Sequence, residues 1–204
     1  MRKKISSHRQ TQGFTLIEVL VSVLILSFGM LGLVGMQAFA LQSNREARLY
    51  SQGINYAREL AEMMRGNNQV SIARLAADNP YLTDSLTPPD NTCLTVGSEA
   101  CDTAKDVAEA QMHDWLSRLD AALPGARVAI CFDSAPYDAT TGQPVWDCTA
   151  GSTGNEEIAV IKIGWTMRAL DTSQNDANAL VRAANNPPQI VIPVTGGNPF
   201  DLAS

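Results

Sequence analysis

Charged side chains are absent from residues 19–44, and this gap is the main feature of an otherwise ordinary composition. Acidic residues are also missing from the first 13 positions, which hold four of the chain's 15 Lys and Arg: Arg2, Lys3, Lys4 and Arg9. A basic segment ahead of a single apolar run is typical of a membrane span whose N-terminus stays in the cytoplasm. Beyond position 13 the chain carries 11 basic against 21 acidic residues, so its charge gives no reason to expect a nucleic-acid partner.

Patterns that bind metals or carry out catalysis are missing as well. His113 is the only histidine beyond the first 13 residues, and there is no C-x-x-C pair, phosphate-binding loop or nucleophile motif. We therefore expect no enzyme activity, no metal and no cofactor, and we interpret His113 as a helix-surface residue. The 204 residues fit one exported domain once the apolar segment is set aside.

Cysteine is absent before position 93 and after position 148, which places all four cysteines beyond the apolar run. An even number of cysteines on the exported side predicts two disulfides. Three connectivities are possible. We favour Cys93 with Cys101 and Cys131 with Cys148, because each pair closes a short loop rich in Pro, Gly or Asp.

The apolar segment that begins at Phe14 is long enough to cross a bilayer, because about 20 residues at about 1.5 Å each cover a hydrocarbon core of roughly 30 Å. A secretory signal peptide is the alternative, since Ala38-Phe39-Ala40 fits a small-x-small cleavage site. The helical pattern continues past that site, however, and we predict one helix over 14–65, ended by Gly66-Asn67-Asn68. Its apolar stripe continues at spacings of four, three, four and three residues through Tyr50, Ile54, Ala57, Ala61 and Met64.

Glu18 is the one carboxylate near the start of this segment, and burying it alone at membrane depth costs about 2 to 3 kcal/mol or more. It either lies close enough to the interface to reach water or it has a partner. The segment holds no counter-charge, but a free α-amino group on Phe14 of a neighbouring subunit would supply one. Three glycines in the same span, Gly29, Gly32 and Gly35, permit close helix approach and also weaken the helix.

The octapeptide Gly13-Phe14-Thr15-Leu16-Ile17-Glu18-Val19-Leu20 resembles the class III signal of type IV pilins and type II secretion pseudopilins. The resemblance implies that a prepilin peptidase cleaves between Gly13 and Phe14 and N-methylates Phe14. It also implies that Glu18 pairs with a terminal amine during assembly. The predicted organisation is a leader at 1–13, a transmembrane and assembly helix at 14–40, an amphipathic continuation at 41–66 and a periplasmic globular domain at 67–204. The protein is then a single-pass inner-membrane protein that later enters a pilus fibre or its tip.

Within that family the span resembles PilV-type minor pilins, also called type IV pilus modification proteins, most clearly over Ser27-Phe28-Gly29-Met30-Leu31-Gly32. Major pilins commonly carry a helix proline that is absent here. The resemblance implies a minor-pilin complex that primes pilus assembly and supports twitching motility and adhesion. The implied partners are prepilin peptidase, other minor pilins, the major pilin and the inner-membrane assembly platform. A type II secretion minor pseudopilin is the alternative, and an anchored sensor or binding protein would require Gly13 to stay unprocessed.

The sequence of the exported part predicts a small α+β domain. We expect a helical turn or two in 70–77, a helix over 104–123 capped by Asp102 or Thr103, and strands at 127–132, 158–167 and 189–194. The segments 136–146 and 171–188 are expected to be connections that make partner-specific contacts. The predicted fold is pilin-like: a long N-terminal helix, membrane-spanning in its first half, packed against a small antiparallel β-sheet.

Overall fold

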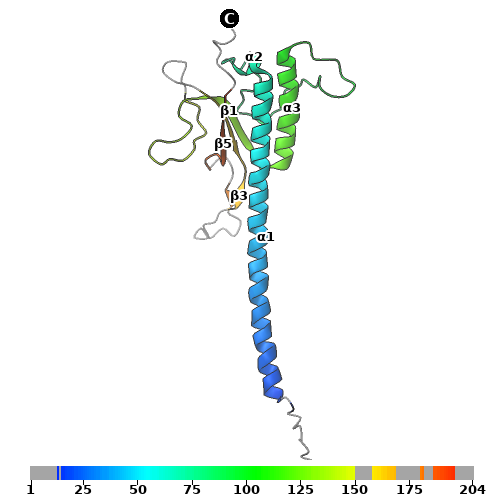
Figure 1. Ribbon diagram of the computed structural model, residues 1–204, viewed down its shortest axis with the longest axis vertical. Coiled ribbons are helices and arrows are strands. Elements are labelled where there is room, and N and C mark those ends of the chain that lie inside the picture. The colour runs from blue at the N-terminus through cyan, green and yellow to red at the C-terminus, as the bar shows by residue number, and fades with distance from the viewer. Residues whose placement is uncertain (1–12, 14, 150–157, 169–179, 182–185, 196–204) are drawn as a thin grey trace, which may run out of the picture. The chain divides into compact units, whose positions relative to one another are not determined.

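The computed structural model describes residues 13, 15–149, 158–168, 180–181 and 186–195 (Figure 1). The chain forms two compact units, Met1–Arg45 and Glu46–Ser204. Phe14 lies outside the described residues. The elements in chain order are α1 (Leu16–Gly66), α2 (Asn68–Ser71), α3 (Ala104–Ala122), β1 (Arg127–Asp133), β2 (Ile158–Gly164), β3 (Met167–Arg168), β4 (Leu180–Val181) and β5 (Ile190–Val194).

Helix α1 confirms the long helix predicted from the sequence, with its ends displaced by one or two residues. It contains no proline, and its second half has an amphipathic pattern that gives it one buried face. Tyr50, at the start of the predicted stripe, is still 48% exposed and Ile54 is partly buried, whereas Ala57, Ala61 and Met64 are buried. The buried residues of α1 are Gly53, Ala57, Leu60, Ala61 and Met64.

Helix α3 begins at a capping box, so Thr103 rather than Asp102 is the cap. The amide N–H of Asp106 donates to Thr103 Oγ1 at 3.1 Å, and the amide N–H of Thr103 donates to Asp106 Oδ2 at 2.8 Å. Pro124-Gly125 follows the helix, and Gly125 has a positive φ of 59°. The buried residues of α3 are Ala108, Ala110, Met112, Trp115, Leu116 and Leu119.

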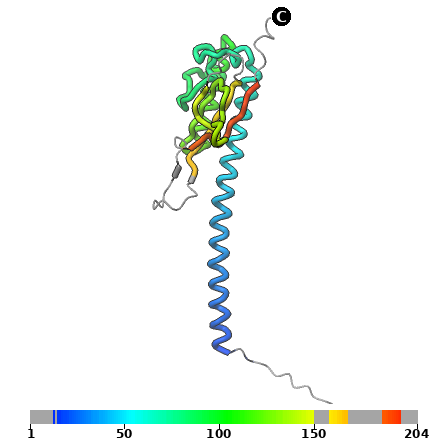
Figure 2. Tube along the Cα trace, turned by 90° about the vertical axis from the view of Figure 1, so that its left-hand side faces the viewer, coloured from blue at the N-terminus to red at the C-terminus, as the bar shows by residue number. Residues whose placement is uncertain are grey.

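The main sheet has three antiparallel strands in the order β1-β2-β5. Figure 2 shows β5, in red, beside the β1–β2 pair. One face of the sheet carries a row of paired isoleucines, with Ile130 opposite Ile161 and Ile161 opposite Ile192. This inner face packs on the helices and forms the sheet's side of the core.

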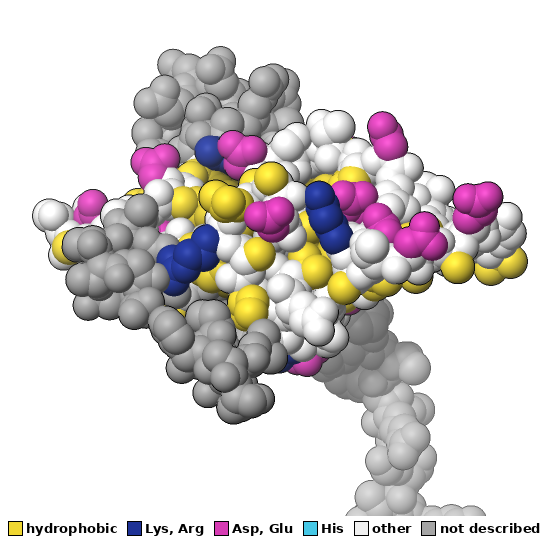
Figure 3. All heavy atoms as spheres, turned by 90° about the horizontal axis from the view of Figure 1, so that it is seen from above, with side chains coloured by type: hydrophobic (Ala, Val, Ile, Leu, Met, Phe, Trp, Pro, Cys, Tyr) yellow, Lys and Arg dark blue, Asp and Glu magenta, His cyan; other side chains and the backbone are white. Residues whose placement is uncertain are grey.

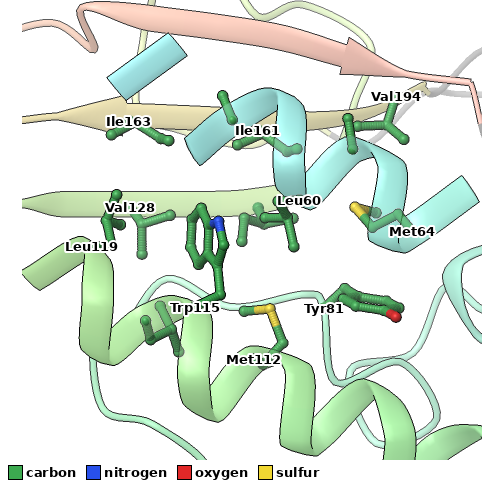
Figure 4. Packing of buried hydrophobic residues seen from close by; sticks show 14 of the residues in the cluster. Leu60, Met64, Tyr81, Met112, Trp115, Leu119, Val128, Ile161, Ile163 and Val194 are labelled. Carbon is green, nitrogen blue, oxygen red and sulfur yellow. The ribbon is translucent and has the colours of Figure 1, made fainter. Parts of the chain in front are cut away.

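The core lies between the inner face of the sheet, α3 and the second half of α1. In Figure 4, Trp115 of α3 points towards Val128, and Leu60 and Met64 of α1 lie beside Ile161 and Val194 of the sheet. Trp115 is fully buried, and its Nε1–H donates to the carbonyl oxygen of Tyr56 at 3.0 Å. The predicted α+β fold, a long helix packed against a small antiparallel sheet, is confirmed.

The prediction of one strand over 158–167 is wrong, because the β1–β2–β5 ladder ends at Gly164. Trp165 enters the core with 2% exposure, and its amide N–H donates to Gln189 Oε1 at 2.9 Å instead of to a neighbouring strand. The amide N–H of Thr166 donates to the carbonyl oxygen of Pro124 at 2.8 Å. The chain then resumes as β3, which pairs with β4 in a separate two-stranded sheet that the sequence did not predict.

The structure contains the disulfides Cys93–Cys101 and Cys131–Cys148, which is the pairing favoured from the sequence. The first closes a loop just before α3. The second joins β1 to the end of the segment 134–149, in which Tyr137 and Pro144 form an isolated bridge. The first disulfide therefore closes a short loop within the connection before α3, whereas the second fixes the segment after β1 to that strand.

Candidate assembly site

Glu18 lies in the first turn of α1, where the carbonyl oxygen of Thr15 accepts from the amide N–H of Glu18 at 3.0 Å and from that of Val19 at 3.3 Å. A carboxylate at this position is favoured by the unpaired N–H groups and the dipole of the helix. The Glu18 side chain is exposed, and no ion pair to it occurs among the residues that the structure describes. The carboxylate is therefore available to a charge from another molecule.

The surface around Glu18 is apolar. Every large apolar side chain from Leu16 to Leu41 is between 48% and 91% exposed. Among the described residues α1 is the one helix that is long and apolar enough to cross a membrane. So much exposed apolar surface is unfavourable in water and requires lipid or other apolar helices around it.

Two serines on the same segment satisfy their hydroxyl groups within the helix. Ser22 Oγ donates to the carbonyl oxygen of Glu18, and Ser27 Oγ donates to that of Val23, both at 2.7 Å. Such bonds let a polar side chain enter an apolar environment without an outside partner. Glu18 differs from these serines because no described residue supplies its counter-charge.

The remaining predicted site residues lie along the same segment. Gly13 is exposed, and a Cβ added to it would meet no atom within 4 Å. Gly29, Gly32 and Gly35 are equally open. The close helix approach expected at these glycines, and the processing expected at Gly13 and Phe14, stay predictions.

His113, interpreted from the sequence as a helix-surface residue, is half-buried. Its Nδ1 lies 2.5 Å from the carbonyl oxygen of Pro89, so it ties the connection before α3 to that helix. Acidic side chains dominate this part of the domain: residues 78–120 include nine Asp and Glu against Lys105 and Arg118. Figure 3 shows Asp and Glu side chains spread over one face of the molecule with few Lys and Arg among them.

A buried ion pair in the globular unit was missed by reasoning from the sequence. Lys162 Nζ lies 2.6 Å from Asp133 Oδ2, and both side chains are 0% exposed. Lys162 Nζ also donates to the carbonyl oxygen of Asp147 at 2.7 Å. The available signal was a single lysine within an otherwise apolar strand, Ile158–Gly164, whose neighbours on both faces turn out to be buried.

The Asp133 carboxylate is held in its charged form by its surroundings. Burial alone would raise its pKa, but the Lys162 ammonium and the amide N–H groups of Ala135 and Thr149 lower the pKa below its ordinary value. Those amides donate to Asp133 Oδ1 at 2.9 and 3.1 Å. A buried pair with this many hydrogen bonds is a fixed part of the fold rather than a free reactive group.

Comparison with known families identifies the class of protein, and this class agrees with the one that the sequence around Glu18 indicates. Residues 8–34 match the model described as the prokaryotic N-terminal methylation motif, so the chain carries a class III signal of the prepilin type. Residues 35–115 match the model described as type IV pilin Tt1218. The two matches together cover more than half of the chain, and the protein belongs to the type IV pilin-like family. No curated protein and no solved structure matches the chain.

Proposed function

We propose that the protein is a minor type IV pilin of the PilV type. In this proposal prepilin peptidase removes residues 1–13 between Gly13 and Phe14 and methylates the new amine of Phe14. The processed subunit joins a complex of minor pilins at the inner membrane, with the globular unit in the periplasm. That complex primes pilus assembly by the major pilin and the assembly platform, and so supports twitching motility and adhesion. The role is structural and not enzymatic.

The observation that carries the proposal is the exposed Glu18 carboxylate in the first turn of an apolar helix. A subunit with this helix can leave the bilayer only if other helices bury its apolar surface. Burial of Glu18 without a counter-charge opposes that step, whereas a terminal amine of a neighbouring subunit would neutralise it. Glu18 thereby fixes the position of one subunit relative to the next.

Two measurements test the proposal. Mass spectrometry of the mature N-terminus should find a chain that begins at a methylated Phe14, and a start at Leu41 would show a secretory signal peptide instead. Glu18→Ala should leave cleavage and membrane insertion intact and reduce incorporation into pili. Glu46→Ala, which removes a carboxylate of the same helix outside the apolar segment, is the matched control and should assemble normally.

A type II secretion minor pseudopilin would use the same processing signal and the same Glu18 pairing. Two disulfides in a chain of this length favour the pilus. Deletion of the gene separates the two functions, because loss of surface pili and twitching supports the minor pilin. Loss of protein secretion with normal pili would support the pseudopilin.

A further inference from the structure

The outer face of the main sheet, opposite the helices, is covered over the middle of β1 and β2, whereas Ile158 and Pro193 on the same face are exposed. Ala129 and Val160 belong to this face and are only 5% and 2% exposed. Lys162 lies on the same face, opposite Ala129 in the strand register. The described cover includes the end of the segment 134–149, which the Cys131–Cys148 disulfide joins to β1.

Three consecutive residues of this segment are attached to the β1–β2 pair, each in a different way. The carbonyl oxygen of Asp147 accepts from Lys162 Nζ at 2.7 Å. Cys148 is bonded to Cys131. The amide N–H of Thr149 donates to Asp133 Oδ1 at 3.1 Å, and its carbonyl oxygen accepts from the amide N–H of Ser134 at 3.0 Å. The disulfide is the central and only covalent attachment of the three.

Burial of Lys162 depends on these attachments. Among the described residues its ammonium group donates to two acceptors, Asp133 Oδ2 and the Asp147 carbonyl oxygen, and the second belongs to the covering segment. A charged amine that loses an acceptor in a dry environment is driven towards water. The disulfide opposes this movement of Lys162, because it keeps residue 147 within reach of the ammonium group. It also limits the conformations that the covering segment could adopt if it detached.

We propose that the Cys131–Cys148 disulfide is a redox-sensitive closure of the sheet's outer face. In the oxidised chain residues 147–149 cover Lys162. When a dithiol reductant converts the disulfide to two thiols and is itself oxidised to a disulfide, these residues separate from β2 and Lys162 reaches solvent. An external protein disulfide reverses the step by accepting two electrons from the two thiols, which release two protons. The outer face is thus completed only in an oxidising compartment.

The chain provides its own reference for a test by amine labelling. Beyond residue 13 it has two lysines, the exposed Lys105 on α3 and the buried Lys162. In the oxidised full chain in detergent micelles, an amine-reactive reagent should modify Lys105 and spare Lys162, as read by peptide mass spectrometry. In the C131S/C148S variant the labelling rate of Lys162 relative to Lys105 should rise on the order of tenfold or more.

The C93S/C101S variant is the matched control, because it removes the other disulfide and should leave Lys162 protected. Hydrogen exchange of the α3 amides distinguishes opening of the cover from unfolding of the domain, because α3 should keep its protection in C131S/C148S. An unchanged labelling ratio in that variant would overturn the proposal. An equal rise in both variants, or loss of α3 protection together with the rise, would overturn it as well.

Discussion

The ammonium nitrogen of Lys162 lies 2.6 Å from a carboxylate oxygen of Asp133, and neither side chain is exposed to solvent. The pair joins the middle of β2 to the last residue of β1, on the face of the sheet that does not contact the helices. Two opposite charges placed this way depend on each other, because the loss of one leaves the other buried without a counter-charge.

Replacing one member of this pair should lower the free energy of unfolding more than replacing both members. Lys162→Met alone should lower the free energy of unfolding by about 3 to 5 kcal/mol, because it leaves the Asp133 carboxylate buried without a counter-charge. The double variant Asp133→Leu with Lys162→Met should cost clearly less, since it loses backbone hydrogen bonds but buries no unpaired charge. Urea unfolding of the full chain in micelles gives both values. Glu62→Ala, which breaks the exposed Arg65–Glu62 pair at 2.5 Å, is the control and should cost less than about 1 kcal/mol. Equal losses in the single and double variants would contradict the argument.

The lowered pKa of Asp133 predicts how the free energy of unfolding depends on pH. Its folded-state pKa lies below the ordinary carboxyl value of 3.8, so its contribution is present above that value and is lost as the pH falls through the folded-state pKa. Unfolding free energies measured from about pH 6 to about pH 2 should therefore decline at the acid end. The decline should be smaller in the Asp133→Leu, Lys162→Met double variant, and the same acid dependence in both proteins would assign the effect to other groups.

Gly53 lets the sheet approach α1 closely. A Cβ at this position would lie 2.6 Å from Ile190 Cδ1 and 3.0 Å from Trp165 Cζ3. Gly53→Ala should cost about 1 to 3 kcal/mol from crowding, reduced by about 1 kcal/mol because alanine favours the helix. Ile190→Val removes the nearer atom and should recover part of the loss in the double variant. Gly66→Ala, where a Cβ meets no atom within 4 Å, should be neutral or stabilising.

Gly32 tests whether the apolar segment packs closely against other helices. The position is open in the single chain, so Gly32→Leu should not disturb processing or membrane insertion. If neighbouring helices approach at this glycine, the added side chain should reduce incorporation of the subunit into pili, measured by immunoblotting of sheared fibres. Val34→Leu enlarges a side chain that is already 62% exposed and should incorporate normally. Normal incorporation of Gly32→Leu would show that neighbouring helices do not approach closely at this glycine.

Most of the correct sequence predictions rest on patterns formed by residues that are close together in the sequence. The stripe through Ala57, Ala61 and Met64 predicted α1, and the threonine three residues before Asp106 gave one of the two expected caps of α3. The break after Gly164 was not predictable, because it depends on Gln189 and Pro124, which lie far away in the sequence. Burial of Lys162 was missed for the same reason, since its acceptors come from other segments.

The candidate assembly site was more accessible to sequence reasoning than the core. Glu18 stands out because a lone carboxylate in an apolar run needs an explanation, and the structure places it exposed on α1. Its pairing with a terminal amine stays a prediction. The partner of Glu18 belongs to another molecule in the proposal, so neither the sequence nor the fold of one chain can identify it.

The buried face of α1 begins well after its apolar run ends. No described residue before Gly53 is buried, whereas the exposed apolar run ends at Leu41. Among the described residues, the buried core therefore includes no residue of the apolar run. In the proposed assembly, lipid around that run can therefore be exchanged for protein without repacking these core residues, so we expect the domain to stay folded before, during and after the transfer.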